Sequence, residues 1–247
     1  TPPKRFKELE IMPNIESSQN GQHYWLYDSE CFSDISSELF ESGYWKKLNA
    51  VNGQESGRGT TWFIQHKSHS LVLRHYLRGG MMSKISNDHY LFKGWQKSRS
   101  VSEFNILSLL NQQNLPVPKP AAAQVVKRGL YYQADLLTHR IPNAQDLLQV
   151  LKQVQSKDFY FTLGALIARF HKAGVYHADL NIQNILQDEE GLFWLIDFDR
   201  AKMLKPKHAW KSSNLKRLKR SFEKEVTRHG IKWTHNDWNY LIEGYSQ

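Results

Sequence analysis

The segments HADLNIQN (residues 177–184) and WLIDFDR (residues 194–200) hold an aspartate and an asparagine five residues apart, and then a second aspartate after an apolar run. Mg²⁺ binds oxygen ligands, and it usually takes only one or two from protein carboxylates while phosphate oxygens complete its shell. Asn184 and Asp197 would supply such a partial set. Asp179, on the same loop as Asn184, could accept a proton from an attacking hydroxyl. Either segment alone is more typical of a turn, so the interpretation depends on the rest of the chain.

The composition is that of a globular protein. Of 247 residues, 40% are hydrophobic and 13% aromatic, which predicts one large domain or two lobes. The formal charge of +9 favours nucleotides, nucleic acids or anionic lipids without choosing among them. Cys31 is the single cysteine, which excludes an intrachain disulfide and favours a reducing cytoplasm. The sequence has no apolar run of about 18 residues, so we expect no membrane span.

Hydrophobic periodicity and turn residues predict a strand-rich first half and a helix-rich second half. We place the boundary so that residues 1–138 form an N-terminal segment and N-lobe and residues 139–247 form the C-lobe. Residues 1–54 are mixed in character, with possible short helices near 33–40 and 41–48. The other expected elements are a hairpin of Thr61–His66 and Leu71–Leu77, a helix Val101–Gln112, a hairpin of residues 121–126 and 130–137, and a long helix ending at Gly174.

The two aspartate segments resemble the signatures of protein kinases. HADLNIQN is similar to the catalytic loop that begins H-R-D-L and ends in Asn, and DFD is similar to D-F-G with its last residue changed. Asp197 stands eighteen positions after Asp179, the same interval as in kinases. The resemblance implies an α+β, protein-kinase-like bilobal fold with a β-rich N-lobe and a reduced helical C-lobe.

The same resemblance implies three further parts of an ATP site. Gly57 and Gly59 in SGRGTT occupy the position of the glycine loop that covers the phosphates. In LVLR, Arg74 stands where kinases have a lysine, and Glu103 lies on the following helix as its ion-pair partner. Lys84 is the alternative phosphate ligand.

The chain also departs from the protein-kinase pattern. Asp199 replaces the final glycine of D-F-G, and Asn181 stands where protein kinases often have lysine. The sequence has no A-P-E segment. These departures argue against an activation-loop switch and against a standard protein-kinase active loop.

A more specific resemblance runs from about Gly57 to Tyr245. The segments GRGTTWFI, LVLRHYLRGG, LPVPKPAA, YYQADLLTHRIPNA, GVYHADLNIQNIL and WLIDFDRAK together are similar to the 3-deoxy-manno-octulosonic acid (Kdo) kinases of lipopolysaccharide assembly. That resemblance implies transfer of phosphate from ATP, with Mg²⁺, to the 4-hydroxyl of Kdo on a lipid A precursor. It further implies a peripheral enzyme at the cytoplasmic side of the bacterial inner membrane, with no nucleic acid and no obligate protein partner.

Other functions stay open from the sequence. A small atypical protein kinase or an antibiotic phosphotransferase would carry a similar loop, and a basic, aromatic-rich surface also suits an RNA-binding module.

The segment from Lys202 to Arg228 is strongly basic. Within it, Leu215, Leu218 and Phe222 recur at helical spacing. We expect an amphipathic helix that either meets an anionic membrane surface or packs its apolar side on the C-lobe.

Overall fold

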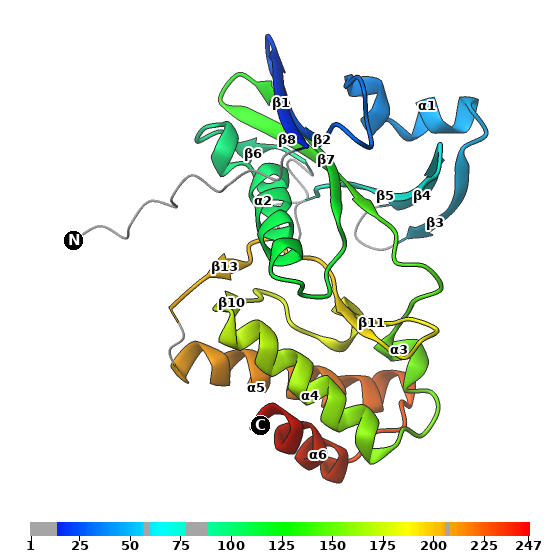
Figure 1. The fold of residues 1–247 in the computed structure, drawn as a ribbon, viewed down its shortest axis with the longest axis vertical. Coiled ribbons are helices and arrows are strands. Elements are labelled where there is room, and N and C mark those ends of the chain that lie inside the picture. Colours follow the sequence, from blue (N-terminus) through cyan, green and yellow to red (C-terminus); the bar gives the residue numbers. More distant parts are fainter. Residues whose placement is uncertain (1–13, 57–59, 78–87, 206–207) are drawn as a thin grey trace. The chain divides into compact units, whose positions relative to one another are not determined.

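The computed structural model of the 247-residue chain describes residues 14–56, 60–77, 88–205 and 208–247 (Figure 1). Gly57, Gly59 and Lys84 lie outside these residues. The chain forms two units. Unit 1 comprises Thr1–Gln112 and Pro118–Arg140, and unit 2 comprises Gln113–Val117 and Ile141–Gln247. The combination of an antiparallel sheet with helices confirms the expected α+β class.

Unit 1 is built on one antiparallel sheet with the strand order β1-β2-β7-β8-β5-β4-β3, and β6 pairs with β8. The strands are β1 (Ile15–Asn20), β2 (His23–Asp28), β3 (Val51–Ser56), β4 (Thr60–His66), β5 (His69–His75), β6 (Tyr90–Leu91), β7 (Pro120–Arg128) and β8 (Tyr131–His139). Both expected hairpins, β4–β5 and β7–β8, are confirmed. The expectation for residues 1–54 was incomplete, because β1, β2 and most of β3 are strands there.

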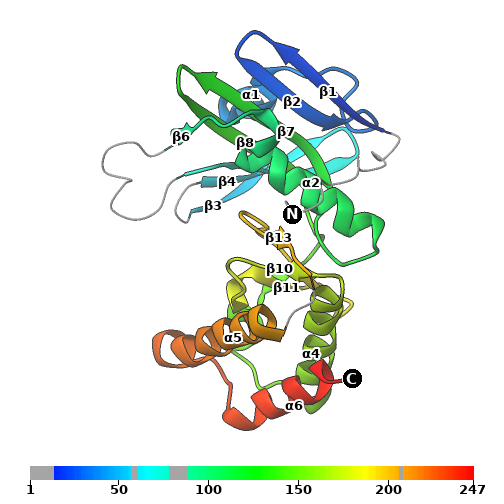
Figure 2. The ribbon, with the colours of Figure 1, turned by 90° about the vertical axis from the view of Figure 1, so that its left-hand side faces the viewer.

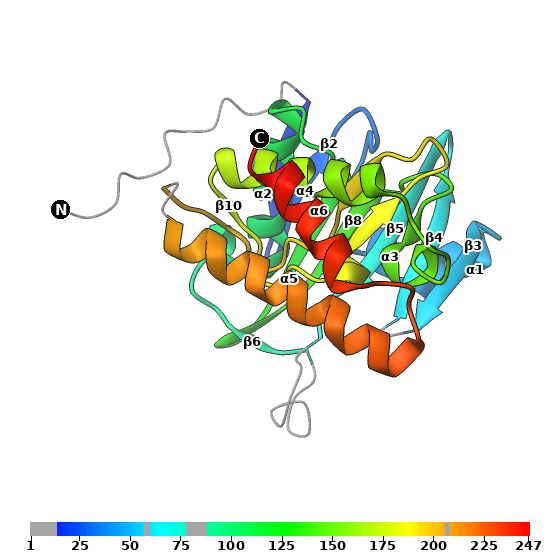
Figure 3. The ribbon, with the colours of Figure 1, turned by 90° about the horizontal axis from the view of Figure 1, so that it is seen from below.

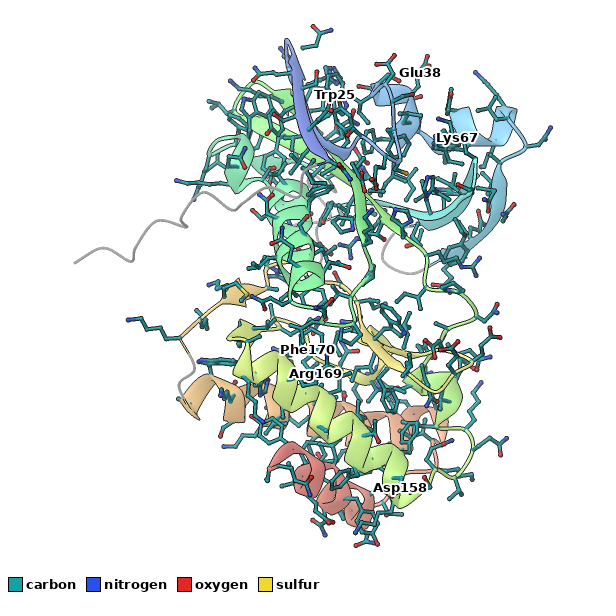
Figure 4. All side chains as sticks on the ribbon, viewed as in Figure 1. Trp25, Glu38, Lys67, Asp158, Arg169 and Phe170 are labelled. Atoms are coloured by element: carbon teal, nitrogen blue, oxygen red, sulfur yellow. The ribbon has the colours of Figure 1, made fainter. Side chains whose placement is uncertain are left out.

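The two faces of this sheet carry different layers. On one face, Leu71 and Leu73 join a core with Trp25 and Trp45, which includes the 3₁₀ helix Ser37–Phe40 and α1 (Ser42–Lys47). Figure 4 labels Trp25 on this sheet. On the other face lies α2 (Arg99–Gln112), which packs against β7 and β8 (Figures 1 and 2). Strand side chains alternate between faces, so Arg74 projects away from the face that Leu71 and Leu73 share.

The expected helix Val101–Gln112 begins two residues earlier, at Arg99. A short 3₁₀ helix, Trp95–Lys97, precedes it. The side chains that α2 buries include Val101, Phe104, Leu107 and Leu110. Their spacing of three and four residues is that of one helix face.

Unit 2 is mostly helical. Its helices are α3 (Leu147–Val150), α4 (Lys157–Lys172), α5 (His208–His229) and α6 (His235–Tyr245), with a 3₁₀ helix at Ile182–Asn184. Two small antiparallel sheets complete it, β10 (Val175–Tyr176) with β13 (Lys202–Met203), and β9 (Gln145–Asp146), β11 (Ile185–Gln187) and β12 (Phe193–Leu195). Gly174 follows α4 with a φ of +84°, which is the helix-ending role expected from the sequence.

Two glycines bring α4 and α6 into backbone contact. A Cβ added to Gly164 would lie 1.9 Å from the Leu241 carbonyl oxygen, and one added to Gly244 would lie 1.9 Å from the Phe161 oxygen. Figure 3 shows α6 crossing α4, with α5 beside them, and Figure 4 labels the buried Phe170 on α4. The two helices therefore tolerate no side chain at these positions.

We expect Gly164→Ala to destabilise unit 2 by about 1–3 kcal/mol or more, because the new methyl group meets backbone atoms, which cannot rotate away as a side chain can. Hydrogen–deuterium exchange should become faster in peptides from α4 and α6. Gly43→Ala is the matched control, since Gly43 lies in α1 and no atom lies within 4 Å of an added Cβ. Equal exchange in the two variants would show that the α4–α6 contact is looser than described.

Candidate active site

The segment 177–184, the candidate catalytic loop, is folded around one backbone carbonyl group. The side-chain Nδ2 atoms of Asn181 and Asn184 both donate to the Asp179 carbonyl oxygen at 2.9 Å. The Asn181 oxygen caps the following 3₁₀ turn by accepting from the Gln183 N–H. Since Nδ2 of Asn184 is used in this way, its Oδ1 is the atom that a cation could contact. The spacing of the two asparagines thus shapes the loop and leaves the Oδ1 of Asn184 as a candidate metal ligand.

His177 holds the loop in place. Its side chain is buried, its Nε2 donates to the Ile196 carbonyl oxygen at 2.9 Å, and its Nδ1 accepts from the Asp179 N–H. One donor and one acceptor define a neutral imidazole with the hydrogen on Nε2. Burial lowers the pKa of His177 and favours that neutral form. His177 is therefore a brace for the loop.

Asp197 lies beside the end of the loop. Ile196, the residue before Asp197, donates its N–H to the Asn184 carbonyl oxygen at 3.0 Å, so this backbone hydrogen bond holds the two predicted metal ligands near each other. Asp197 is half-buried, and its φ of +60° is uncommon for a residue with a side chain. Such conformations cluster at functional sites, where the surrounding structure enforces them. The amide oxygen of Asn184 and the carboxylate of Asp197 fit the hard-oxygen preference of Mg²⁺.

The second group of predicted residues lies in unit 1. Arg74 on β5 and Glu103 on α2 form an ion pair with 2.5 Å between Nη2 and Oε2, as expected from their positions in the sequence. Glu103 is 3% exposed, whereas the Arg74 side chain is 27% exposed. The buried Glu103 carboxylate therefore fixes the guanidinium group of Arg74, while part of the arginine side chain stays exposed.

Tyr76 is a member of this group that the sequence analysis missed. Its hydroxyl donates to Glu103 Oε2 at 2.5 Å and accepts from Arg74 Nη2 at 3.2 Å. Burial first, and then the Glu103 charge, raise the pKa of Tyr76, so the phenol keeps its proton and acts as a donor. The signal was present in the alternation of the strand, because residues 74 and 76 share one face.

Helix α5 supports the candidate catalytic loop from the other side. Asn214 and His177 exchange two hydrogen bonds, in which the His177 N–H donates to Asn214 Oδ1 and Asn214 Nδ2 donates to the His177 carbonyl. Seven residues later on α5, Ser221 Oγ accepts from the Ile182 N–H at 3.2 Å. Leu218, which lies between Asn214 and Ser221, and Phe222, which follows Ser221, are fully buried. Two of the three apolar residues of this stripe, Leu218 and Phe222, therefore pack within unit 2, while Leu215 is half-buried.

Arg217, on the same helix, pairs with the predicted base. Its Nη1 lies 3.1 Å from Asp179 Oδ1, and the two side chains are 44% and 46% exposed. From the sequence, Arg217 was one of many surface cations of a basic helix. That view was incomplete, because Arg217 lies one helical turn after Asn214 and so faces the loop.

Comparison with known proteins gives a consistent assignment. The sequence model of the lipopolysaccharide kinase (Kdo/WaaP) family matches residues 42–245. The chain is 46% identical over 232 residues to a 3-deoxy-D-manno-octulosonic acid kinase of Vibrio vulnificus (strain CMCP6), covering 94% of this chain and 98% of the relative. It is 41% identical over 238 residues to the kinase of the same name from Haemophilus influenzae (strain 86-028NP), covering 93% and 98%.

Proposed function

Because this chain belongs to the lipopolysaccharide kinase (Kdo/WaaP) family, and is thus a phosphotransferase with an alcohol acceptor, we propose that it phosphorylates the 4-hydroxyl of a Kdo sugar on a lipid A precursor, using ATP and Mg²⁺. The observation that carries the chemistry is the position of Asp179. Its backbone is fixed by His177, Asn181 and Asn184, while its carboxylate is 46% exposed and can reach an acceptor.

In the proposed reaction, Asp179 accepts the proton of the sugar hydroxyl as its oxygen attacks the γ-phosphorus. The bond between that phosphorus and the β–γ bridging oxygen breaks, and ADP leaves with the electron pair. Mg²⁺, held by Asn184 and Asp197, would neutralise phosphate charge. Arg74, steadied by Glu103 and Tyr76, would bind oxygens of the phosphates that are not transferred. Gly57 and Gly59 remain predicted members of the phosphate-covering loop.

The decisive experiment is transfer of labelled γ-phosphate to purified Kdo-lipid A precursor, compared with a protein acceptor, an aminoglycoside and lipid A that lacks Kdo. We expect label only in the Kdo-containing acceptor, and the product should resist periodate cleavage at the C4–C5 diol. Label in protein or aminoglycoside would instead favour an atypical protein kinase or an antibiotic phosphotransferase. RNA binding without Mg-ATP binding would favour the nucleic-acid alternative.

We also propose that the outer side of α5 brings the enzyme to the anionic face of the inner membrane. In the described part of the chain, no helix combines the length and apolar character needed to span a bilayer. Leu218 and Phe222 are buried, so the attraction would be electrostatic. The cations of α5 that lie outside the contacts with the catalytic loop include Lys216, Lys219 and Arg220, which lie close together in the sequence.

We expect replacement of Lys216, Lys219 and Arg220 by Gln to weaken sedimentation with phosphatidylglycerol-containing vesicles at low salt by roughly 100-fold. The reason is that each cation contributes about 1 kcal/mol at an anionic surface. Arg217 is left intact because it contacts Asp179. The control replaces three exposed lysines elsewhere, Lys47, Lys97 and Lys152, and removes the same charge. If both triple variants lose binding equally, net charge rather than α5 draws the enzyme to the vesicles.

A further inference from the structure

Arg217 has hydrogen-bonding capacity beyond its contact with the predicted base. A guanidinium group has five N–H donors in a fixed plane. One of them, on Nη1, donates to Asp179 Oδ1, and within the described ranges the structure gives Arg217 no second hydrogen-bond partner. With its side chain 44% exposed, the remaining donors can reach a bound molecule. Arg217 is therefore suited to hold two anions, Asp179 and one more.

The candidate catalytic loop itself supplies no such cation. At position 181, where protein kinases often have lysine, both ends of the Asn181 side chain are engaged, Nδ2 with the Asp179 carbonyl and Oδ1 with the Gln183 N–H. Among the residues that the structure describes, Arg217 is the cation paired with the Asp179 carboxylate. Positive charge next to the base thus comes from α5.

A cation at this point would stabilise the proposed acceptor. Kdo is an acidic sugar, whose carboxylate is attached to C2, and one ring carbon separates C2 from the C4 that bears the reacting hydroxyl. When this hydroxyl reaches Asp179, the sugar carboxylate comes close to the carboxylate of the base. Two neighbouring carboxylates repel each other unless a cation lies between them. A planar guanidinium that already contacts one of them is suited to bind the other.

We propose that Arg217 is a specificity-determining residue, which binds the carboxylate of the acceptor sugar while it contacts Asp179 and so directs the neighbouring hydroxyl to the base. The inference rests on the proposed function. The position of Arg217 is set independently of any substrate, because Asn214 and Ser221 fix the same face of α5 to the loop. The site selects an alcohol in which one ring carbon separates the carbon that bears the hydroxyl from the carbon that bears a carboxylate. It disfavours neutral sugars.

The test measures kcat/KM for two water-soluble acceptors, the deacylated Kdo-lipid A saccharide and the same saccharide with the Kdo carboxylate reduced to an alcohol. Deacylation removes membrane binding from the measurement. We expect the parent enzyme to prefer the acid by roughly 10- to 100-fold, which is typical for loss of a charged hydrogen bond. Arg217→Gln should use the two acceptors within about threefold of each other, with an unchanged KM for ATP. Arg217→Lys keeps the charge without the fork and should retain part of the preference.

Arg228→Gln is the matched control, since it removes an exposed arginine from the same helix and should leave the preference for the acid intact. If Arg217 acted only by positioning Asp179, Arg217→Gln would lower kcat by the same factor with both acceptors, and the proposal would be wrong. A parent enzyme that uses both acceptors equally well overturns it too. If the parent enzyme phosphorylates neither saccharide nor the intact lipid, the proposed function fails, and this inference fails with it.

Discussion

Asp179→Ala is expected to lower phosphoryl transfer by roughly 100- to 10,000-fold while ATP still binds, which is the range for loss of a positioned general base. This substitution should leave the conformation of the loop unchanged. The loop is fixed through the Asp179 backbone, whose carbonyl accepts from Asn181 and Asn184 and whose N–H donates to His177. An alanine at 179 keeps all three bonds, so the loss should lie in the chemical step.

Single-turnover transfer and ATP titration of the same preparations give the measurement. Asp197→Ala is the comparison, because loss of a predicted metal ligand should weaken Mg-dependent nucleotide binding itself. Asp179→Asn keeps the size and should be as inactive as Asp179→Ala. Transfer near the parent rate in either Asp179 variant would exclude the base role. Loss of ATP binding in both would place Asp179 in the nucleotide site instead.

Arg74→Ala is the second change with a large expected effect, a severe loss of ATP use. The variant removes the proposed phosphate-binding cation and also leaves Glu103, 3% exposed, without its arginine. Breaking a buried pair in this way costs up to about 3–5 kcal/mol, so part of the loss would reflect stability. The double variant Arg74→Met with Glu103→Gln removes both charges together and separates the two contributions.

The double variant should fold nearly as well as the parent and still use ATP poorly, as judged by thermal unfolding and by the KM for ATP. Lys84→Ala, at the alternative position, should have only a mild effect. If Lys84→Ala proves severe and the Arg74 variants mild, Lys84 is the phosphate ligand and Arg74 serves the structure of unit 1.

The parts of the site that the sequence predicted are those encoded locally. The interval from Asp179 to Asn184 lies within one loop, and Arg74 and Glu103 follow from the order of a hairpin and a helix. Arg217 and Tyr76 contact these residues through the packing of α5 on the loop and of α2 on the sheet. Strand alternation places Tyr76 on the same face as Arg74, but spacing alone does not reveal that Arg217 faces the loop. Their elements were predicted, but not the direction in which each side chain points.

The strands of the first 54 residues were missed for a different reason. β1, IESSQN, is largely polar and exposed, so it has no apolar alternation. β2, HYWLYD, buries residues on both faces and therefore lacks the period of two that identifies a half-buried strand. β3 contains a bulge between Val51 and Gly53, which breaks the pattern again. β2 is a strand because it pairs with β7, which lies far along the chain, and β3 is a strand because it pairs with β4, which follows it closely in the sequence.

The position of α5 late in the sequence also bears on when, during synthesis, the candidate catalytic loop can be completed. The candidate catalytic loop is synthesised before Asn214, Arg217 and Ser221, yet it depends on all three for its bracing and for its charge. A ribosome that has translated only as far as β13 carries every predicted ATP-site residue but a loop without that support. We therefore expect that a chain cut short by a stop codon before Asn214 keeps the predicted ATP-site motifs but lacks the contacts of α5 with the candidate catalytic loop, and that it transfers no phosphate.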